Sequence, residues 1–217
     1  PETSEYFGSA IAAFSDGNTQ LLIGAFRDNN PTGDDAGAAY VFRLTTRWVE
    51  DQKLVASDGA IGGGQFGMSV AVDGDIVAVG RPFELDPEGG PPETTGNLGA
   101  VYVFESDGEG GWAETKLTAS DGSDLDQFGS SVAVSGDRIV VGAGGDDERS
   151  GAVYVFERNG QGGWLETKLT ASDRSPREYF GYWASNHSGV PVAAEGDRIA
   201  VDLLIPDVLL YPHLDRP

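Results

Sequence analysis

The feature that most constrains the fold of this chain is an internal repeat of three short motifs. The dipeptide Phe-Gly opens each copy, and successive copies start 59, 62 and 52 residues apart. Each of the first three copies continues with a Tyr-Val-Phe segment and then with a segment that opens on Trp. The motifs begin at Phe7, Phe66, Phe128 and Phe180, at Tyr40, Tyr102 and Tyr154, and at Trp48, Trp112 and Trp164. A constant order at a nearly constant period indicates a repeat architecture, in which every copy forms the same unit.

Each full copy is predicted to form four short strands. In the third copy these strands are rich in Val, Ile, Tyr and Phe and are separated by Gly, Asp and Ser. They cover residues 130–135, 137–143, 151–157 and 164–170. No segment keeps the apolar period of about 3.6 residues that marks an amphipathic helix, so we expect almost no helix.

The pattern within a copy also indicates where each strand lies. Residues 139–141 and 153–156 are apolar on both faces, so both faces of these strands must be covered. Residues 164–169 alternate, with Glu166 and Lys168 on one face and leucines on the other, which is typical of an outer edge strand. Sheets of this kind favour an all-β propeller built of four-stranded antiparallel blades packed face to face. A sandwich of stacked sheets is the alternative.

We interpret residues 1–217 as a single propeller-type domain or a fragment of one. Its repeats lie at about 5–58, 59–121 and 122–173, and a degenerate fourth lies at about 174–217, where no Tyr-Val-Phe or Trp segment follows Phe180. Three interpretations stay open: a compact four-bladed ring, a piece of a larger propeller, or an open array that a partner chain completes. Exposed blade faces are apolar, so an open array is expected to self-associate and so complete the ring.

The run from Asp126 to Ala143, followed by residues 151–157 and 164–173, resembles the FG-GAP repeat family. These are the repeats of integrin alpha-subunit propellers and of many secreted bacterial and archaeal proteins. The resemblance covers about residues 5–181. It implies a β-propeller, an extracellular or cell-surface location, and work in binding or adhesion. The Gly-Ala-Pro half of the family motif is incomplete in all three copies, which read Gly-Ala-Phe, Gly-Arg-Pro and Gly-Ala-Gly.

Acidic residues gather in the segments that should meet at one rim of the blades. In a four-stranded meander, the loops between the second and third strands and the blade-to-blade connections lie on the same side. Asp146, Asp147 and Glu148 in such a loop are our candidates for ligand contact, because loops on a rigid scaffold concentrate function. We therefore predict a non-enzymatic module that binds a protein or glycan through this rim. The alternative interpretation is a solvated acidic surface that keeps the protein soluble.

One connection also offers candidate metal ligands. Asp121, Asp124 and Asp126 place three carboxylates within six residues, and calcium takes oxygen ligands of this type. A plain acidic turn is the alternative. The resemblance points to calcium elsewhere, since the family often carries a calcium loop between the first two strands of a blade. Those positions are tight turns here, so that site does not carry over, and no other cofactor is expected.

Two further functions stay open as alternatives. Trp183 breaks the repeat pattern, and Asn186 beside it could hydrogen-bond a sugar, as in a lectin-like carbohydrate-binding module. The chain could instead be an accessory propeller domain of a larger secreted enzyme. The repeating Trp residues are expected to pack in the core or between blades.

Composition excludes several classes of partner and chemistry. The formal net charge of −21 argues against nucleic acid, because binding to phosphates needs clustered Lys and Arg. No apolar run approaches the roughly 20 residues that cross a bilayer, so no membrane insertion is expected. The only histidines, His187 and His213, form neither a triad nor a metal-ligand spacing, and there is no Cys. We therefore expect this chain not to be an enzyme.

Overall fold

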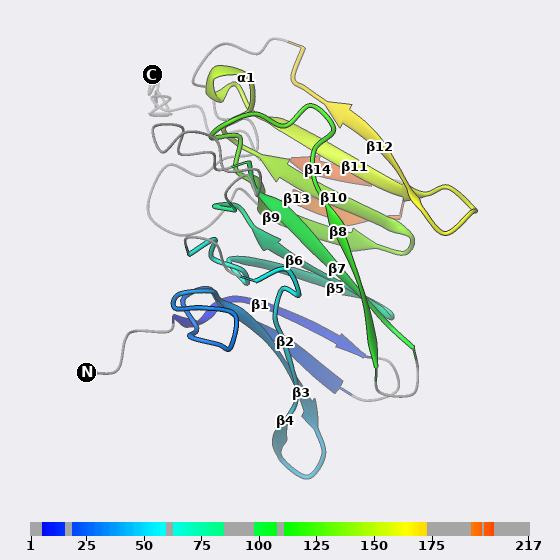
Figure 1. The fold of residues 1–217 in the computed structure, drawn as a ribbon. Coiled ribbons are helices and arrows are strands. Elements are labelled where there is room, and N and C mark those ends of the chain that lie inside the picture. Colours follow the sequence, from blue (N-terminus) through cyan, green and yellow to red (C-terminus); the bar gives the residue numbers. More distant parts are fainter. Residues whose placement is uncertain are drawn as a thin grey trace, which may run out of the picture.

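In the computed structural model, residues 6–15, 19–59, 63–84, 98–107, 111–172, 192–196 and 198–201 are described. They form three four-stranded antiparallel sheets and one two-stranded hairpin, which stack face to face (Figure 1). In every four-stranded sheet the spatial order of the strands equals their order in the sequence. We call these sheets blades 1, 2 and 3. The prediction of propeller-type, four-stranded antiparallel blades is confirmed for all three full repeats.

The elements follow the repeats closely. Blade 1 consists of β1 (Phe7–Ser15), β2 (Thr19–Ala25), β3 (Ala38–Leu44) and β4 (Trp48–Leu54). Blade 2 consists of β5 (Ser69–Asp73), β6 (Ile76–Arg81), β7 (Ala100–Ser106) and β8 (Trp112–Leu117). Blade 3 consists of β9 (Phe128–Ser135), β10 (Arg138–Ala143), β11 (Ala152–Arg158) and β12 (Trp164–Leu169). The hairpin is β13 (Val192–Glu195) with β14 (Arg198–Val201), and the one helical turn in the described part is α1 (Asp146–Arg149).

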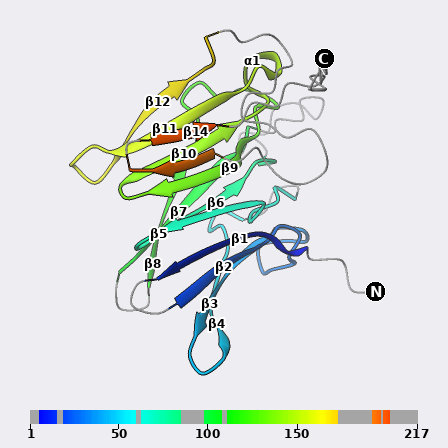
Figure 2. The same cartoon turned by 180° about the vertical axis from the view of Figure 1, so that it is seen from behind.

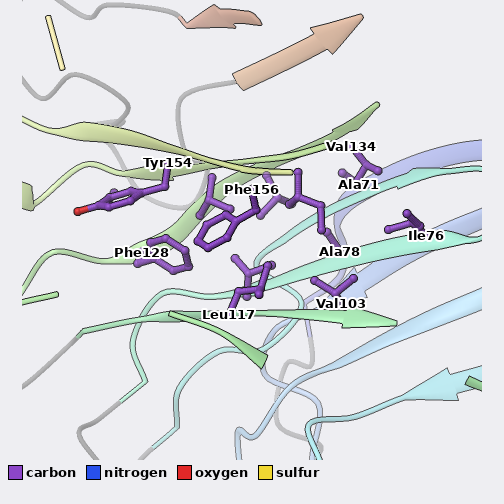
Figure 3. Packing of buried hydrophobic residues seen from close by; sticks show 14 of the residues in the cluster. Ala71, Ile76, Ala78, Val103, Leu117, Phe128, Val134, Tyr154 and Phe156 are labelled. Carbon is purple, nitrogen blue, oxygen red and sulfur yellow. The ribbon is translucent and has the colours of Figure 1, made fainter. Parts of the chain in front are cut away.

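The hydrophobic core lies between the blades rather than inside any one of them. One cluster joins blade 1 to blade 2 and a second joins blade 2 to blade 3. In the second cluster, Ala78 and Val103 of blade 2 face Phe128 and Phe156 of blade 3 (Figure 3). A strand that lies between two such clusters needs apolar side chains on both faces, which explains the uninterrupted apolar runs of the middle strands.

Glycines set how closely the blades approach. A Cβ atom built on Gly24 would lie 2.0 Å from the carbonyl oxygen of Gly67, and one built on Gly80 would lie 2.1 Å from that of Gly129. Gly67 and Gly129 also have φ angles of +92° and +90°, which side chains with a Cβ rarely adopt. The Phe-Gly motif and the next-to-last residue of the second strand, a glycine, therefore form one close contact between neighbouring blades.

The repeating tryptophans lie where the repeats predict, with one exception. Trp112 packs against the cluster between blades 1 and 2, and Trp164 packs against the cluster between blades 2 and 3. Trp48 is 44% exposed, because no described segment covers that side of blade 1. The expectation of buried packing thus holds for Trp112 and Trp164 and is wrong for Trp48.

The outer strand β12 lies at the edge of its sheet as predicted, but its apolar face is not the covered one. Leu165 is 60% exposed, whereas Glu166 and Lys168 bind groups of the preceding connection. The polar face of this strand is thus the one that makes specific contacts.

The hairpin β13–β14 lies within the degenerate fourth repeat. Val192, Ala194 and Ile199 pack on Ala133 and Val140 of blade 3. Figure 2 shows the hairpin beside blade 3. The cluster between the hairpin and blade 3 also includes Val153 of β11. The other residues of the fourth repeat, 174–191, 197 and 202–217, lie outside the described part.

Candidate functional site: tyrosine–lysine latches on the acidic rim

The acidic rim is organised by the same set of side chains in each blade. The Tyr that opens the Tyr-Val-Phe segment pairs across the sheet with the Lys near the end of the fourth strand. In all three blades the ends of both side chains meet an acid from the loop between the second and third strands, and in blades 2 and 3 they also meet an acid from the preceding connection. We call each set a rim latch. The pairs are Tyr40 with Lys53, Tyr102 with Lys116, and Tyr154 with Lys168.

The latch of blade 3 joins two aspartates. The hydroxyl of Tyr154 lies 2.7 Å from Asp121 Oδ1 and 2.7 Å from Asp146 Oδ2. Lys168 Nζ donates to Asp121 Oδ2 at 2.7 Å and to Asp146 Oδ2 at 2.8 Å. Asp121 belongs to the connection from blade 2, so this latch ties that connection to the outer strand of blade 3.

The latch of blade 2 contains a second cation. Tyr102 Oη lies 2.8 Å from Asp58 Oδ1 and 2.9 Å from Glu84 Oε2. Lys116 Nζ donates to Asp58 Oδ2 at 2.6 Å and also to Glu84. Arg81, which is almost fully buried, donates from Nη1 to Asp58 Oδ1 at 3.2 Å and to Tyr102 Oη at 3.0 Å. Two cations therefore face two carboxylates.

The latch of blade 1 has a single acid in the described part of the chain. Asp28 accepts from Tyr40 Oη at 2.5 Å and from Lys53 Nζ at 2.5 Å. Asp28 is 2% exposed. Each of the three latches thus contains its own loop acid, whereas an acid from a preceding connection is described only for blades 2 and 3.

Each connection is also bound through a serine. Ser57 donates from its hydroxyl to Glu114 at 2.6 Å, and Ser120 donates in the same way to Glu166 at 2.7 Å. The backbone N–H of each serine points to the same carboxylate. The connection between two blades is therefore fastened to the outer strand of the following blade by a Ser–Glu contact and an Asp–Lys contact.

Burial and charge shift the pKa values of the latch groups in a consistent way. Burial and the neighbouring carboxylates raise the pKa of Tyr102 and of Tyr154, so both hydroxyls stay protonated and act as donors. Burial lowers the pKa of Lys168, but its bonds to Asp121 and Asp146 raise it above its ordinary value. Hydrogen bonds from Lys168 and Tyr154 lower the pKa of Asp121. The latch lysines are thus charged and the connection aspartates ionised at neutral pH.

The three ligand candidates of the third copy divide into one buried and two exposed residues. Asp146 is 2% exposed and its carboxylate is bound by Tyr154 and Lys168. Asp147 and Glu148 are exposed, with φ angles of +52° and +59°. Arg149 follows with φ +68°, so three consecutive residues without a glycine hold a left-handed backbone at this rim.

The three metal candidates are used in different ways. Asp121 lies in the latch, Asp124 is exposed, and Asp126 is buried and accepts a hydrogen bond from the backbone N–H of Ser123 at 2.6 Å. Within the described residues, no three Asp, Glu, His or Cys side chains come together in a way that could hold a metal ion. Calcium binding therefore stays a prediction from the sequence.

Two further candidates, Trp183 and Asn186, lie outside the described residues. The functional groups that sequence reasoning missed are the Tyr and Lys of each latch and the Ser of each connection. A signal for them was present, because Ala-Ser-Asp recurs at residues 56–58, 119–121 and 171–173 and each fourth strand ends in Lys-Leu. In the part of the chain that the structure describes, no helix has the length and apolar character needed to cross a membrane.

Comparison with known proteins agrees with this repeat pattern. A family model described as FG-GAP repeat matches residues 1–42, 48–104 and 112–156. Among solved structures, a mutant of the Aleuria aurantia lectin in complex with alpha-methyl-L-fucoside is similar at 11% identity and a TM-score of 0.46. That match covers 89% of this chain, which spans about half (52%) of the lectin chain. The family match extends over three blades, each with its Phe-Gly contact and Tyr-Val-Phe strand, and the chain belongs to the FG-GAP repeat family.

Proposed function

We propose that this chain is an extracellular, non-enzymatic binding module that presents its acidic rim to a protein or glycan. The observation that carries the proposal is that the rim acids form two groups, one buried in the latches and one exposed on the loops. The latches use Asp28, Glu84 and Asp146, which are buried, and this leaves a second set of exposed acids on loops that the latches hold in place. The exposed set contains Asp34, Asp35, Asp124, Asp147 and Glu148.

The loop at Asp147 and Glu148 is the strongest candidate for ligand contact. Left-handed φ angles at residues other than glycine cost roughly 1–3 kcal/mol each and persist only where the surrounding structure enforces them. Here the enforcing contacts are backbone hydrogen bonds from Arg149 N to Gly145 O and from Gly151 N to Asp146 O, at 3.0 and 2.9 Å. The loop thereby presents two carboxylates in a preset arrangement, which suits a ligand with basic groups or hydroxyls.

The test compares two variants that change the net charge equally on opposite rims. Asp147→Lys with Glu148→Lys alters the proposed binding rim. Asp75→Lys with Asp137→Lys alters exposed turns on the other rim. Both variants and the unaltered chain are screened on a printed glycan array and on an array of extracellular proteins. We expect the first pair to weaken binding at least about tenfold, while the matched control keeps it.

The outcomes separate rim recognition from general charge effects. An equal loss in both variants would show that only net charge matters, and no loss in the first variant would contradict the rim proposal. Hits confined to the glycan array would support the lectin-like alternative. An array without hits would favour the accessory-domain alternative, in which a larger secreted enzyme supplies the activity. We also propose that copies of the chain associate through the open ends of the stack of blades.

A further inference from the structure

Blade 1 differs from the other two blades in the cover on its Phe-Gly face. Phe66 of blade 2 and Phe128 of blade 3 are each 0% exposed, whereas Phe7 is 54% exposed. Ile11 is 63% exposed, and its counterpart Val132 in blade 3 is 8% exposed. Together with Trp48, these residues form an apolar surface that we call the open face of blade 1.

The open face is built in the same way as its covered counterparts. The ring centroids of Phe7 and Tyr40 are 5.4 Å apart, and the corresponding distances in blades 2 and 3 are 5.4 and 5.3 Å. The residues of blade 1 are therefore already arranged as one half of a blade-to-blade interface. The missing half is the kind of surface that blades 1 and 2 present to the blades that follow them.

The rim latch of blade 1 lacks the same neighbour. In blades 2 and 3, the fourth-strand Glu and Lys bind a Ser and an Asp from the preceding connection. Glu50 and Lys53 hold the equivalent sheet positions in blade 1, opposite Phe42 and Tyr40. In the described part of the chain, no serine or aspartate from a preceding connection reaches them. The apolar surface and the polar rim of blade 1 thus both match the surfaces with which blades 2 and 3 receive a neighbouring blade.

The opposite end of the stack carries the complementary surface. In the cluster between blades 2 and 3, the paired residues Ala71 and Ala78 belong to the side of blade 2 that meets Phe128. The pair Ala193 and Ala200 holds the same register positions in the hairpin β13–β14, and both residues are exposed. The outward side of the hairpin thus carries two exposed alanines at the register positions that accommodate a Phe-Gly face in blade 2, with the exposed Glu195 and Arg198 beside them.

We propose that two copies of this chain associate head to tail, with the hairpin face of one copy covering the open face of blade 1 in the other. The two faces lie at opposite ends of the stack in both views, so one molecule in this arrangement does not bring them together (Figures 1 and 2). The interface joins two different surfaces, so it either closes into a ring or extends, and it has the same form as the contacts already present inside the chain. This inference rests on the self-association part of the proposed function and names the surfaces that meet.

The experiment measures molar mass in solution by light scattering over a range of concentrations, in about 1 M salt to screen the net charge. The unaltered chain is expected to form dimers or larger assemblies. Ile11→Glu changes the open face and Ala200→Glu changes the hairpin face, and each variant alone is expected to be monomeric. Leu125→Glu is the matched control, because Leu125 is an exposed leucine in a connection away from both faces. Thermal melting of each monomeric variant checks that it is folded.

The decisive measurement is the molar mass of a mixture of the two variants. Ile11→Glu leaves the hairpin face intact and Ala200→Glu leaves the open face intact, so an equimolar mixture is expected to recover a dimer with one working interface. A monomeric unaltered chain at every concentration would overturn the proposal. Continued association of Ala200→Glu would overturn it in favour of blade 1 pairing with itself. Ligand binding by the monomeric Ile11→Glu variant is measured separately, so a failure of association and a failure of rim recognition are distinguishable.

Discussion

The rim latches of blades 2 and 3 each contain a tyrosine, a lysine and a connection aspartate at equivalent positions, yet the number of cations relative to carboxylates differs between them. In blade 2, Arg81 and Lys116 face Asp58 and Glu84. In blade 3, the position of Arg81 is taken by Ala143, and Lys168 alone serves Asp121 and Asp146. A third acid, Asp126, is buried in the adjoining connection.

The difference comes from two positions that change together. Blade 2 has a small residue at the first and a large one at the second, and blade 3 has the reverse. Asp126 and Gly64 both lie two residues before the Phe of the Phe-Gly motif. A Cβ atom on Gly64 would lie 2.3 Å from Arg81 Nε, so the buried guanidinium in blade 2 requires the glycine. In blade 3 a small Ala143 accompanies Asp126 instead. The comparison shows that one pair of residues turns a charge-balanced latch into an acid-rich one without changing the blade.

The largest predicted effect is that of Arg81→Ala in blade 2. This change leaves Asp58 and Glu84 with one cation, and breaking a buried ion pair from one side costs about 3–5 kcal/mol. Urea unfolding should show this loss in the free energy of unfolding. Arg81→Met keeps most of the volume and serves as control. A nearly unchanged stability of Arg81→Met would show that packing rather than charge is responsible.

The double substitution Arg81→Ala with Gly64→Asp tests the exchange itself. It gives blade 2 the residue pair of blade 3. If the two positions are coupled, the double variant is more stable than the sum of the single changes predicts. If the two single losses in the free energy of unfolding simply add, the two positions are not coupled and the proposed exchange between the blades is contradicted.

Asp126→Asn is expected to stabilise the protein at neutral pH and not in acid. Burial, and secondarily the charge of Asp146, raise the pKa of Asp126 to about 6 from an ordinary value of 3.8. The folded state therefore holds this proton more tightly than the unfolded state, and stability falls as the pH rises from about 4 to about 6. At about 1.4 kcal/mol per pKa unit the gain at pH 8 reaches up to ~3 kcal/mol. Urea unfolding at pH 4 and pH 8 measures it, and a gain that does not depend on pH would contradict the assignment.

Tyr154→Phe is expected to cost more than Tyr102→Phe. Removing the hydroxyl of Tyr154 leaves Asp121 and Asp146 with Lys168 alone, whereas Arg81 remains beside Asp58 in blade 2. A buried hydrogen bond to a charged group contributes about 1.5–3 kcal/mol, so the loss in blade 3 should lie in that range and the loss in blade 2 below it. Thermal melting of the two variants compares them directly. Equal losses would mean that Arg81 does not compensate.

The smallest predicted effects come from the serines of the connections. Ser57→Ala and Ser120→Ala each remove one hydroxyl donor to a half-exposed glutamate, at an expected cost of about 0.5–1 kcal/mol. Since the two contacts are nearly identical, their costs should agree, and differential scanning calorimetry can compare them. A clear difference would show that the blade 1–blade 2 and blade 2–blade 3 junctions are not equivalent.

Much of the fold could be predicted from the sequence because the same local patterns recur in each repeat. Alternation, turn residues and apolar runs place the strands within a few residues, so residues 137–143 become β10 at Arg138–Ala143. The candidate site was harder to predict. Asp146 and Asp147 are neighbours of the same type, and the sequence contains no signal that buries the first in a latch and exposes the second.

The sequence by itself determined the repeat unit and the four-stranded blade, since both depend on β-propensity, turn residues and apolar patterning within about 60 residues. Only the tertiary structure decided which acids are buried in a latch and which are exposed. That outcome depends on where Tyr154, Lys168 and a connection from the preceding blade meet, and residues 121 and 168 come together only when two blades stack. The same stacking decides that Phe128 is buried while Phe7 is exposed, because cover is supplied by a neighbouring blade and not by the motif itself.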